Sequence, residues 1–140
     1  MTQRRVRQIM DVWYGDGPLG YCGDEDYGEM ASWYVLSAMG FYTVAPGRPV
    51  YDIGCPLFEK STIDLGGGKT FTVEAPDVSA QNKYIQSATL NGRPIDRPWF
   101  THEELQQGGT LFLQMGPRPN RSWGANPEKM PFTDHDAPKN

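Results

Sequence analysis

The sequence predicts an α+β fold in which two N-terminal helices precede an antiparallel β-sandwich or sheet. Apolar residues recur at helical spacing before residue 41, and after residue 50 they alternate with a period of two. The 140 residues include 16 glycines and 12 prolines, which divide the second part into short segments. This proportion makes the chain rich in turns but is below that of a disordered chain.

The first helix is predicted over residues 3–14. Its apolar residues lie at positions i, i+3, i+4, i+7 and i+8, which form one face of a helix. Thr2 can cap its start and Gly15 can end it. Residues 15–20 hold three glycines and a proline and therefore form a turn. The residues of the apolar face are Val6, Ile9, Met10, Trp13 and Tyr14.

A second helix is predicted from Glu25 to Met39, with Asp24 as its N-cap and Gly40 just after its end. Nearly every residue from Trp33 to Phe41 is apolar or small. We therefore expect this helix to be buried on more than one side, unlike the first.

Five strands are predicted after residue 46, because apolar residues alternate there between turn signals. The turns are Gly66-Gly67-Gly68 and Asn91-Gly92. Thr101 and Glu104 form a capping box, which predicts a short helix over residues 102–106. From Gly116 the chain is rich in proline, so we expect an extended tail that is ordered only where it packs. The strands are residues 50–53, 61–65, 70–75, 84–90 and 110–115.

Composition excludes several classes of protein. The chain has 13 basic and 17 acidic residues, a net charge of −4, which does not suit binding to nucleic acid. No apolar run is long enough to span a membrane, and the N-terminal residues contain no signal-peptide core. Cys22 and Cys55 are too few for a disulfide framework or a four-ligand zinc site. We expect both to be buried thiols, and the sequence does not decide whether they pair.

The most informative segment is the run Asp24-Glu25-Asp26, which directly precedes the apolar helix. A helix N-terminus favours ionised carboxylates, and such a carboxylate can orient and deprotonate a water. A purely structural interpretation remains open, in which Asp24 caps the helix and the other two suit its first turn. An EF-hand is excluded, because the glycine is at 28 rather than 29 and Val35 replaces the bidentate acid.

Two other reactive groups are less favoured. A nucleophilic Cys22 would need a general base, and the only histidines, His102 and His135, are distant in sequence. The triplet Asp134-His135-Asp136 looks like a metal site only superficially, and we expect a solvated tail there.

The string from Gly23 to Tyr42 resembles a signature of glycoside hydrolase family 92, whose members are exo-acting α-mannosidases, many of them α-1,2-specific. The resemblance continues in the family's order to about Gly124. The further matching blocks are residues 46–47, 51–58, 68–71, 84–92 and 108–109.

The resemblance implies that this chain is the C-terminal piece of a larger enzyme. Such enzymes pair an N-terminal β-sandwich with an (α/α)₆ catalytic barrel, depend on calcium and invert the anomeric configuration. Residues 1–45 would then be the last helices of the barrel, 46–118 an antiparallel β region and 119–140 a proline-rich tail. The implied partners are mannose-containing glycans and the rest of the parent enzyme, in the periplasm, at the cell surface or secreted from a bacterium.

The resemblance also implies catalytic roles. The family's base motif maps onto Asp24 and Asp26, and we expect Asp26 to be the base and Asp24 to help orient the water. Glu25 would position the loop or bind substrate. The general acid and most calcium ligands would lie upstream of this chain.

Two alternatives remain. The chain could be a carbohydrate-binding module with Trp99 and Phe100 as its platform, although packing on the sheet is favoured for both. It could also be a purely structural domain that supports the barrel. We further expect the second helix to keep an uncovered apolar surface around Trp33, Tyr34, Leu36 and Met39. The chain would then form a twofold dimer through its helical side, or its helices would be loosely ordered.

Overall fold

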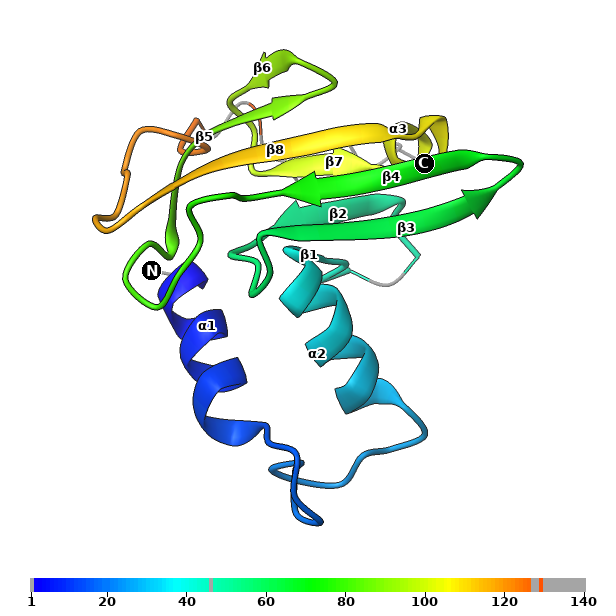
Figure 1. Ribbon diagram of the computed structural model, residues 1–140, viewed down its shortest axis with the longest axis vertical. Helices are drawn as coiled ribbons and strands as arrows, with labels where there is room; N and C mark the ends of the chain where they lie inside the picture. The colour runs from blue at the N-terminus through cyan, green and yellow to red at the C-terminus, as the bar shows by residue number, and fades with distance from the viewer. Residues whose placement is uncertain (1, 46, 127–128, 130–140) are drawn as a thin grey trace, which may run out of the picture.

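The computed structural model describes residues 2–45, 47–126 and 129. The two long helices project from the same side of a layered β region (Figure 1). The α+β fold predicted from sequence is confirmed. The helices are α1 (Thr2–Trp13), α2 (Glu29–Met39) and α3 (His102–Gln107). The strands are β1 (Phe41–Tyr42), β2 (Val50–Ile53), β3 (Lys60–Gly66), β4 (Lys69–Glu74), β5 (Tyr84–Leu90), β6 (Arg93–Ile95), β7 (Trp99–Thr101) and β8 (Gly109–Gly116).

The strands form two sheets. A three-stranded sheet has the order β1-β2-β7, and a five-stranded sheet has the order β3-β4-β8-β5-β6. All pairs are antiparallel except β4 and β8, which run parallel. The sequence predicted antiparallel pairing throughout. The difference arises because the chain leaves β4, forms β5 to β7 and α3, and only then returns beside β4 in the same direction.

The core lies between the two sheets. Phe100 of the small sheet stacks on Phe71 of the large one at 5.3 Å between ring centroids, and Phe41 meets Phe100 edge-on. The inward residues of β8, which include Leu111 and Leu113, are fully buried beneath them. This packing holds the two sheets together, and α1 and α2 project from them.

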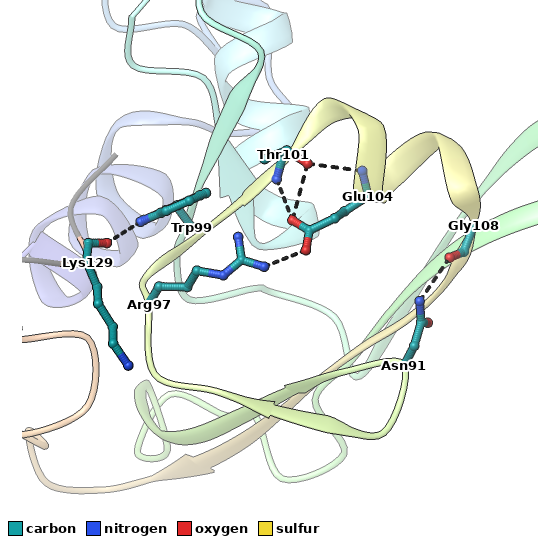
Figure 2. Close-up of polar contacts among 7 residues, drawn as sticks. All are labelled: Asn91, Arg97, Trp99, Thr101, Glu104, Gly108 and Lys129. Atoms are coloured by element: carbon teal, nitrogen blue, oxygen red, sulfur yellow. Dashed lines mark hydrogen bonds and ion pairs between the residues drawn. The ribbon is translucent and has the colours of Figure 1, made fainter. Parts of the chain in front are cut away.

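The five predicted strands are present, but three short ones were not predicted. β1, β6 and β7 have two or three residues each, too few to show an alternating pattern. The short helix α3 is confirmed together with its capping box (Figure 2). The Thr101 hydroxyl accepts a hydrogen bond from the Glu104 N–H, and the Glu104 carboxylate accepts one from the Thr101 N–H.

The start of α2 corrects the sequence prediction. The helix begins at Glu29 rather than Glu25, and Gly28, with φ 98°, takes the N-cap position expected for Asp24. The prediction that this helix is buried on more than one side was also wrong. Only Ser37 and Ala38 of α2 are buried, because the sheets cover only the C-terminal end of the helix.

Other side chains differ from expectation as well. Trp13 was placed on the buried face of α1 but is 57% exposed, whereas Met10 of the same face is buried. Cys22 is exposed rather than buried, while Cys55 is buried as predicted, and both thiols are free. In the tail, Trp123 packs against the core. The triplet at residues 134–136 lies outside the described residues.

Candidate active site: the acidic turn between the helices

The loop that joins α1 to α2 lies at the end of the helices farthest from the sheets (Figure 1). It opens with a tight turn in which the Gly15 N–H donates to the Gly20 carbonyl at 3.1 Å. A Cβ atom at position 20 would lie 2.3 Å from the Gly15 carbonyl oxygen. Only glycine therefore allows the two backbone segments to approach this closely.

Tyr14 contacts both this loop and α2. Its ring stacks on Tyr34 at 4.8 Å and on Trp33 at 5.6 Å, and Tyr21 of the loop meets it edge-on. Its hydroxyl donates to the Met30 carbonyl at 3.4 Å. Burial, followed by the nearby Cys22 and Glu25 side chains, raises the pKa of the Tyr14 hydroxyl. The hydroxyl therefore stays protonated and able to donate.

The acidic turn contains three consecutive left-handed residues. Asp26 has φ 55°, Tyr27 has φ 60° and Gly28 has φ 98°. A non-glycine residue in this region costs about 1–3 kcal/mol, and it persists only where its surroundings impose it. The Tyr27 side chain gains nothing from burial, since it is fully exposed.

Glu25 holds this turn. One carboxylate oxygen accepts a hydrogen bond from the Gly28 N–H at 2.7 Å, and the other accepts one from the Ala31 N–H at 2.9 Å. These are amides at the start of α2, where N–H groups have no partner within the helix. Glu25 therefore performs the capping task that the sequence assigned to Asp24.

Asp24 and Asp26 are both exposed. Within the described part of the chain, neither carboxylate accepts a hydrogen bond from another residue. The structure therefore separates the three predicted acids. Glu25 is engaged by backbone amides, and the two aspartates on either side of it remain open to water. Whether Glu25 also contacts substrate stays a prediction.

The residues of this turn do not fit a calcium site on their own. Across residues 2–45, 47–126 and 129, no three His, Cys, Asp or Glu side chains come close enough to hold a metal ion. Calcium prefers six to eight oxygen ligands. Any calcium site would therefore need most of its ligands from outside these residues.

The predicted sugar platform at Trp99 and Phe100 is not present as expected. Both residues belong to strand β7. Phe100 is fully buried, so its ring cannot meet a ligand. Trp99 is half-buried, with the Arg97 guanidinium 4.4 Å above its ring. The expectation that these rings pack on the sheet is confirmed for Phe100.

Comparison with known proteins points to one family. The model of the glycosyl hydrolase family 92 catalytic domain matches residues 1–117. A curated relative from Arthroderma benhamiae, described as an uncharacterised secreted glycosidase, is 37% identical over 134 residues. That match covers 94% of this chain and 17% of the relative.

Solved structures agree with this result. An inverting family GH92 mannosidase from Bacteroides thetaiotaomicron is 49% identical with a TM-score of 0.89, covering 96% of this chain and 18% of that one. A family GH92 α-mannosidase from the same organism is 32% identical with a TM-score of 0.87, covering 94% and 18%. The latter enzyme was also solved with mannoimidazole. This chain thus spans less than a fifth of the length of these relatives.

Among the described residues of this chain, none of the helices combines the length and the apolar character that a membrane span requires.

Proposed function

This chain belongs to glycosyl hydrolase family 92, and on that basis we propose that it forms the C-terminal part of an inverting exo-α-mannosidase. In this proposal it supplies the general-base carboxylates and is inactive alone. The observation that carries the proposal is the state of the acidic turn. Asp24 and Asp26 are exposed and accept no hydrogen bond from other described residues, while Glu25 holds the backbone that carries them.

Inversion requires a carboxylate that activates water on one face of the sugar and an acid that protonates the leaving group on the other. The two groups stand roughly 6.5–9.5 Å apart to admit the water. We assign the proton-accepting role to Asp26 and the orienting role to Asp24. As the water oxygen bonds to the anomeric carbon, its proton passes to the Asp26 carboxylate, and the glycosidic bond breaks while the leaving oxygen takes a proton from the acid. The acid is a residue of the longer protein.

Several properties of the longer protein follow as proposals. Its substrates are glycans with terminal α-mannose, in keeping with the mannosidases that this chain resembles. Its activity depends on calcium, held by ligands that lie mostly outside the described residues. It acts outside the cytoplasm, in the periplasm, at the cell surface or as a secreted protein of a bacterium, in line with the relative named as secreted.

The test is a chimera in which this sequence replaces the matching segment of the 49% identical mannosidase. We expect the chimera to release mannose from an α-mannoside with β-mannose as the first product, read by NMR. Asp26→Asn should lower kcat by about 10²–10⁴-fold, because an amide of nearly the same shape cannot accept the proton. Asp24→Asn should also lower kcat, by less.

Glu29→Gln is the matched control. Glu29 is exposed, lies three residues from Asp26 and accepts no hydrogen bond from another described residue. Its loss of charge should leave kcat nearly unchanged. Near-normal turnover of the Asp26→Asn chimera would contradict the assignment of the base. Mannose release by the 140-residue chain alone would contradict the proposed need for an acid from elsewhere.

A further inference from the structure

The outer face of the three-stranded sheet carries a carboxylate between two aromatic residues. Asp52 of β2 is paired directly with Tyr42 of β1 on one side and with Trp99 of β7 on the other. Directly opposed residues on neighbouring strands point to the same face of a sheet. The alternate residues, Tyr51 and Phe100, stack on each other in the core. The row Tyr42-Asp52-Trp99 therefore faces away from the core.

A hollow of about 460 Å³ lies beside this row. Its walls come from the start of α1, the end of β2, the start of β5 and the C-terminal segment at residues 119–124. The lining residues used below are Thr2, Gln3, Asp52, Tyr84, Asn120 and Trp123. The volume is within the range of about 300–1,000 Å³ that is typical of small-molecule sites.

Asp52 has an unusual setting for a surface carboxylate. It is half-buried, and burial raises the pKa of its carboxyl, against which only a hydrogen bond from the Val44 backbone N–H acts. No lysine, arginine or histidine is among the described residues that line the hollow. An anionic ligand is thereby disfavoured, and a ligand that donates hydrogen bonds is favoured.

Some of the other polar groups that line the hollow already form hydrogen bonds within the chain, and others can form hydrogen bonds with a ligand. The Asn120 amide donates to the Gln86 carbonyl, and the Trp123 indole N–H donates to the Ile95 carbonyl, so both are engaged. The Gln3 side-chain oxygen accepts from the Ile85 N–H, which leaves its NH₂ group to donate outward. The Thr2 and Tyr84 hydroxyls have no partner among the described residues. The hollow thus offers a strong acceptor, several donors and an aromatic wall at Trp123.

We propose that this hollow binds a pyranose unit of a neutral glycan, with Asp52 accepting hydrogen bonds from its hydroxyls. Gln3 and Tyr84 donate to the sugar oxygens, and Trp123 contacts an apolar face of the ring. A sugar carries donors, acceptors and a C–H face together, which an ammonium ion or an apolar ligand does not.

This site is distinct from the acidic turn. It lies at the first turns of α1, whereas the loop to the acidic turn begins after the last residue of that helix. A helix of 12 residues is about 18 Å long. The site therefore holds a glycan at a distance from the proposed base and needs no hydrolysis to act.

The experiment titrates the 140-residue chain with methyl α-D-mannopyranoside and follows backbone amides by NMR. We expect saturable shifts at Asp52, Tyr84 and Trp123, with dissociation constants in the range of about 1–10 mM. Asp52→Asn should weaken binding about tenfold or more, because a hydrogen bond to a charged acceptor is lost. Glu103→Gln, an exposed acid of α3 outside the hollow, is the matched control and should bind as the parent does.

Four results would overturn the proposal. The first is the absence of shifts around the hollow at saturating sugar while the spectrum shows a folded chain. The second is equal binding by the Asp52→Asn variant. The third is loss of binding in Asp26→Asn, which would place the sugar at the acidic turn. The fourth is tighter binding of methylammonium than of the sugar. Each readout is independent of catalysis, so an inactive chimera would not produce any of them.

Discussion

Three adjacent acids that look equivalent in the sequence have different tasks in the structure. Both carboxylate oxygens of Glu25 accept hydrogen bonds from backbone amides, while the neighbouring Asp24 and Asp26 are exposed to solvent. The Glu25 carboxylate accepts from amides three and six positions further along the chain, and so ties the turn to the first residues of α2.

Glu25→Ala is expected to destabilise the fold of this chain by about 1–2 kcal/mol, because the Gly28 and Ala31 N–H groups lose their acceptor. The measurement is the free energy of unfolding in urea, together with amide exchange at residues 28 and 31. Glu29→Ala removes an equally charged side chain from the same helix end and should change the free energy by no more than about 0.5 kcal/mol. Equal values for the two variants would show that Glu25 does not hold the turn.

Among the elements, α3 shows most clearly how a short helix is held in place. Glu104 closes the capping box with Thr101 and at the same time accepts a hydrogen bond from Arg97, whose guanidinium stacks on Trp99 (Figure 2). The Trp99 indole N–H donates to the Lys129 carbonyl, which links the tail to the same group. One carboxylate thereby connects α3, β7 and the segment before it.

This connection makes the stability of α3 dependent on pH. Burial acts to raise the pKa of Glu104, but the hydrogen bonds from Arg97 and Thr101 outweigh it and hold the pKa below its ordinary value of 4.5. The unfolded chain then binds more protons than the folded chain as the pH falls below about 4.5, so the stabilisation is complete above that value and is lost as the pH falls through the folded pKa. Urea unfolding of the parent and of Glu104→Gln should show the two free energies converging toward pH 3. A constant difference from pH 7 to pH 3 would contradict this.

The sequence predicted elements well where a pattern was long. Strands β3, β4, β5 and β8 have six or more residues, and each was found near its expected bounds. β1, with two residues, offered no period to detect, and β7 carries its buried Phe100 between residues that are only half-buried. The start of α2 was misjudged because acids favour a helix N-terminus in general, whereas here Gly28 and its left-handed neighbours fix the boundary.

The site itself was predictable only in part. The motif located the acidic turn, but no pattern could distinguish Glu25 from the two aspartates, since that depends on which amides lie within reach. The row Tyr42-Asp52-Trp99 was not found, because its members are brought together by strand register and lie far apart in sequence.

Taken as a whole, the molecule has a well-covered β region and a poorly covered helical one. Among the described residues, eight large apolar side chains are exposed, and six of them lie between residues 12 and 35. Leu19 is 93% exposed. The uncovered surface was expected on α2 around Trp33, Tyr34, Leu36 and Met39. Trp33 and Tyr34 are instead half-buried by Tyr14, and Leu36 and Met39 pack against the core. The exposure is greater in the loop and at the end of α1. The exposed residues of this helical surface are Val12, Trp13, Leu19, Tyr21, Tyr27 and Val35.

We expect the isolated chain to associate through this helical surface, most simply as a twofold dimer, or to keep its helices loosely ordered. Sedimentation at increasing concentration tests the first outcome, and hydrogen exchange in α1 and α2 relative to β4 and β8 tests the second. Leu19→Ser with Val35→Ser should reduce association, whereas Val44→Ser with Phe58→Ser, equally apolar and exposed outside the surface, should not. A strict monomer with both helices strongly protected would contradict both outcomes.

The parallel pair of β4 and β8 has a consequence for how the chain folds. β8 is the last strand in the part of the chain that the structure describes, yet it lies in the middle of its sheet, between β4 and β5. Val73, for example, is paired with Leu111. The β3–β4 hairpin can form from local contacts, but its inner edge stays unpaired until β8 has been synthesised and docked. Such high contact order slows folding. In the interval, the bare β4 edge can pair with another chain, so aggregation of nascent or shortened chains should begin there.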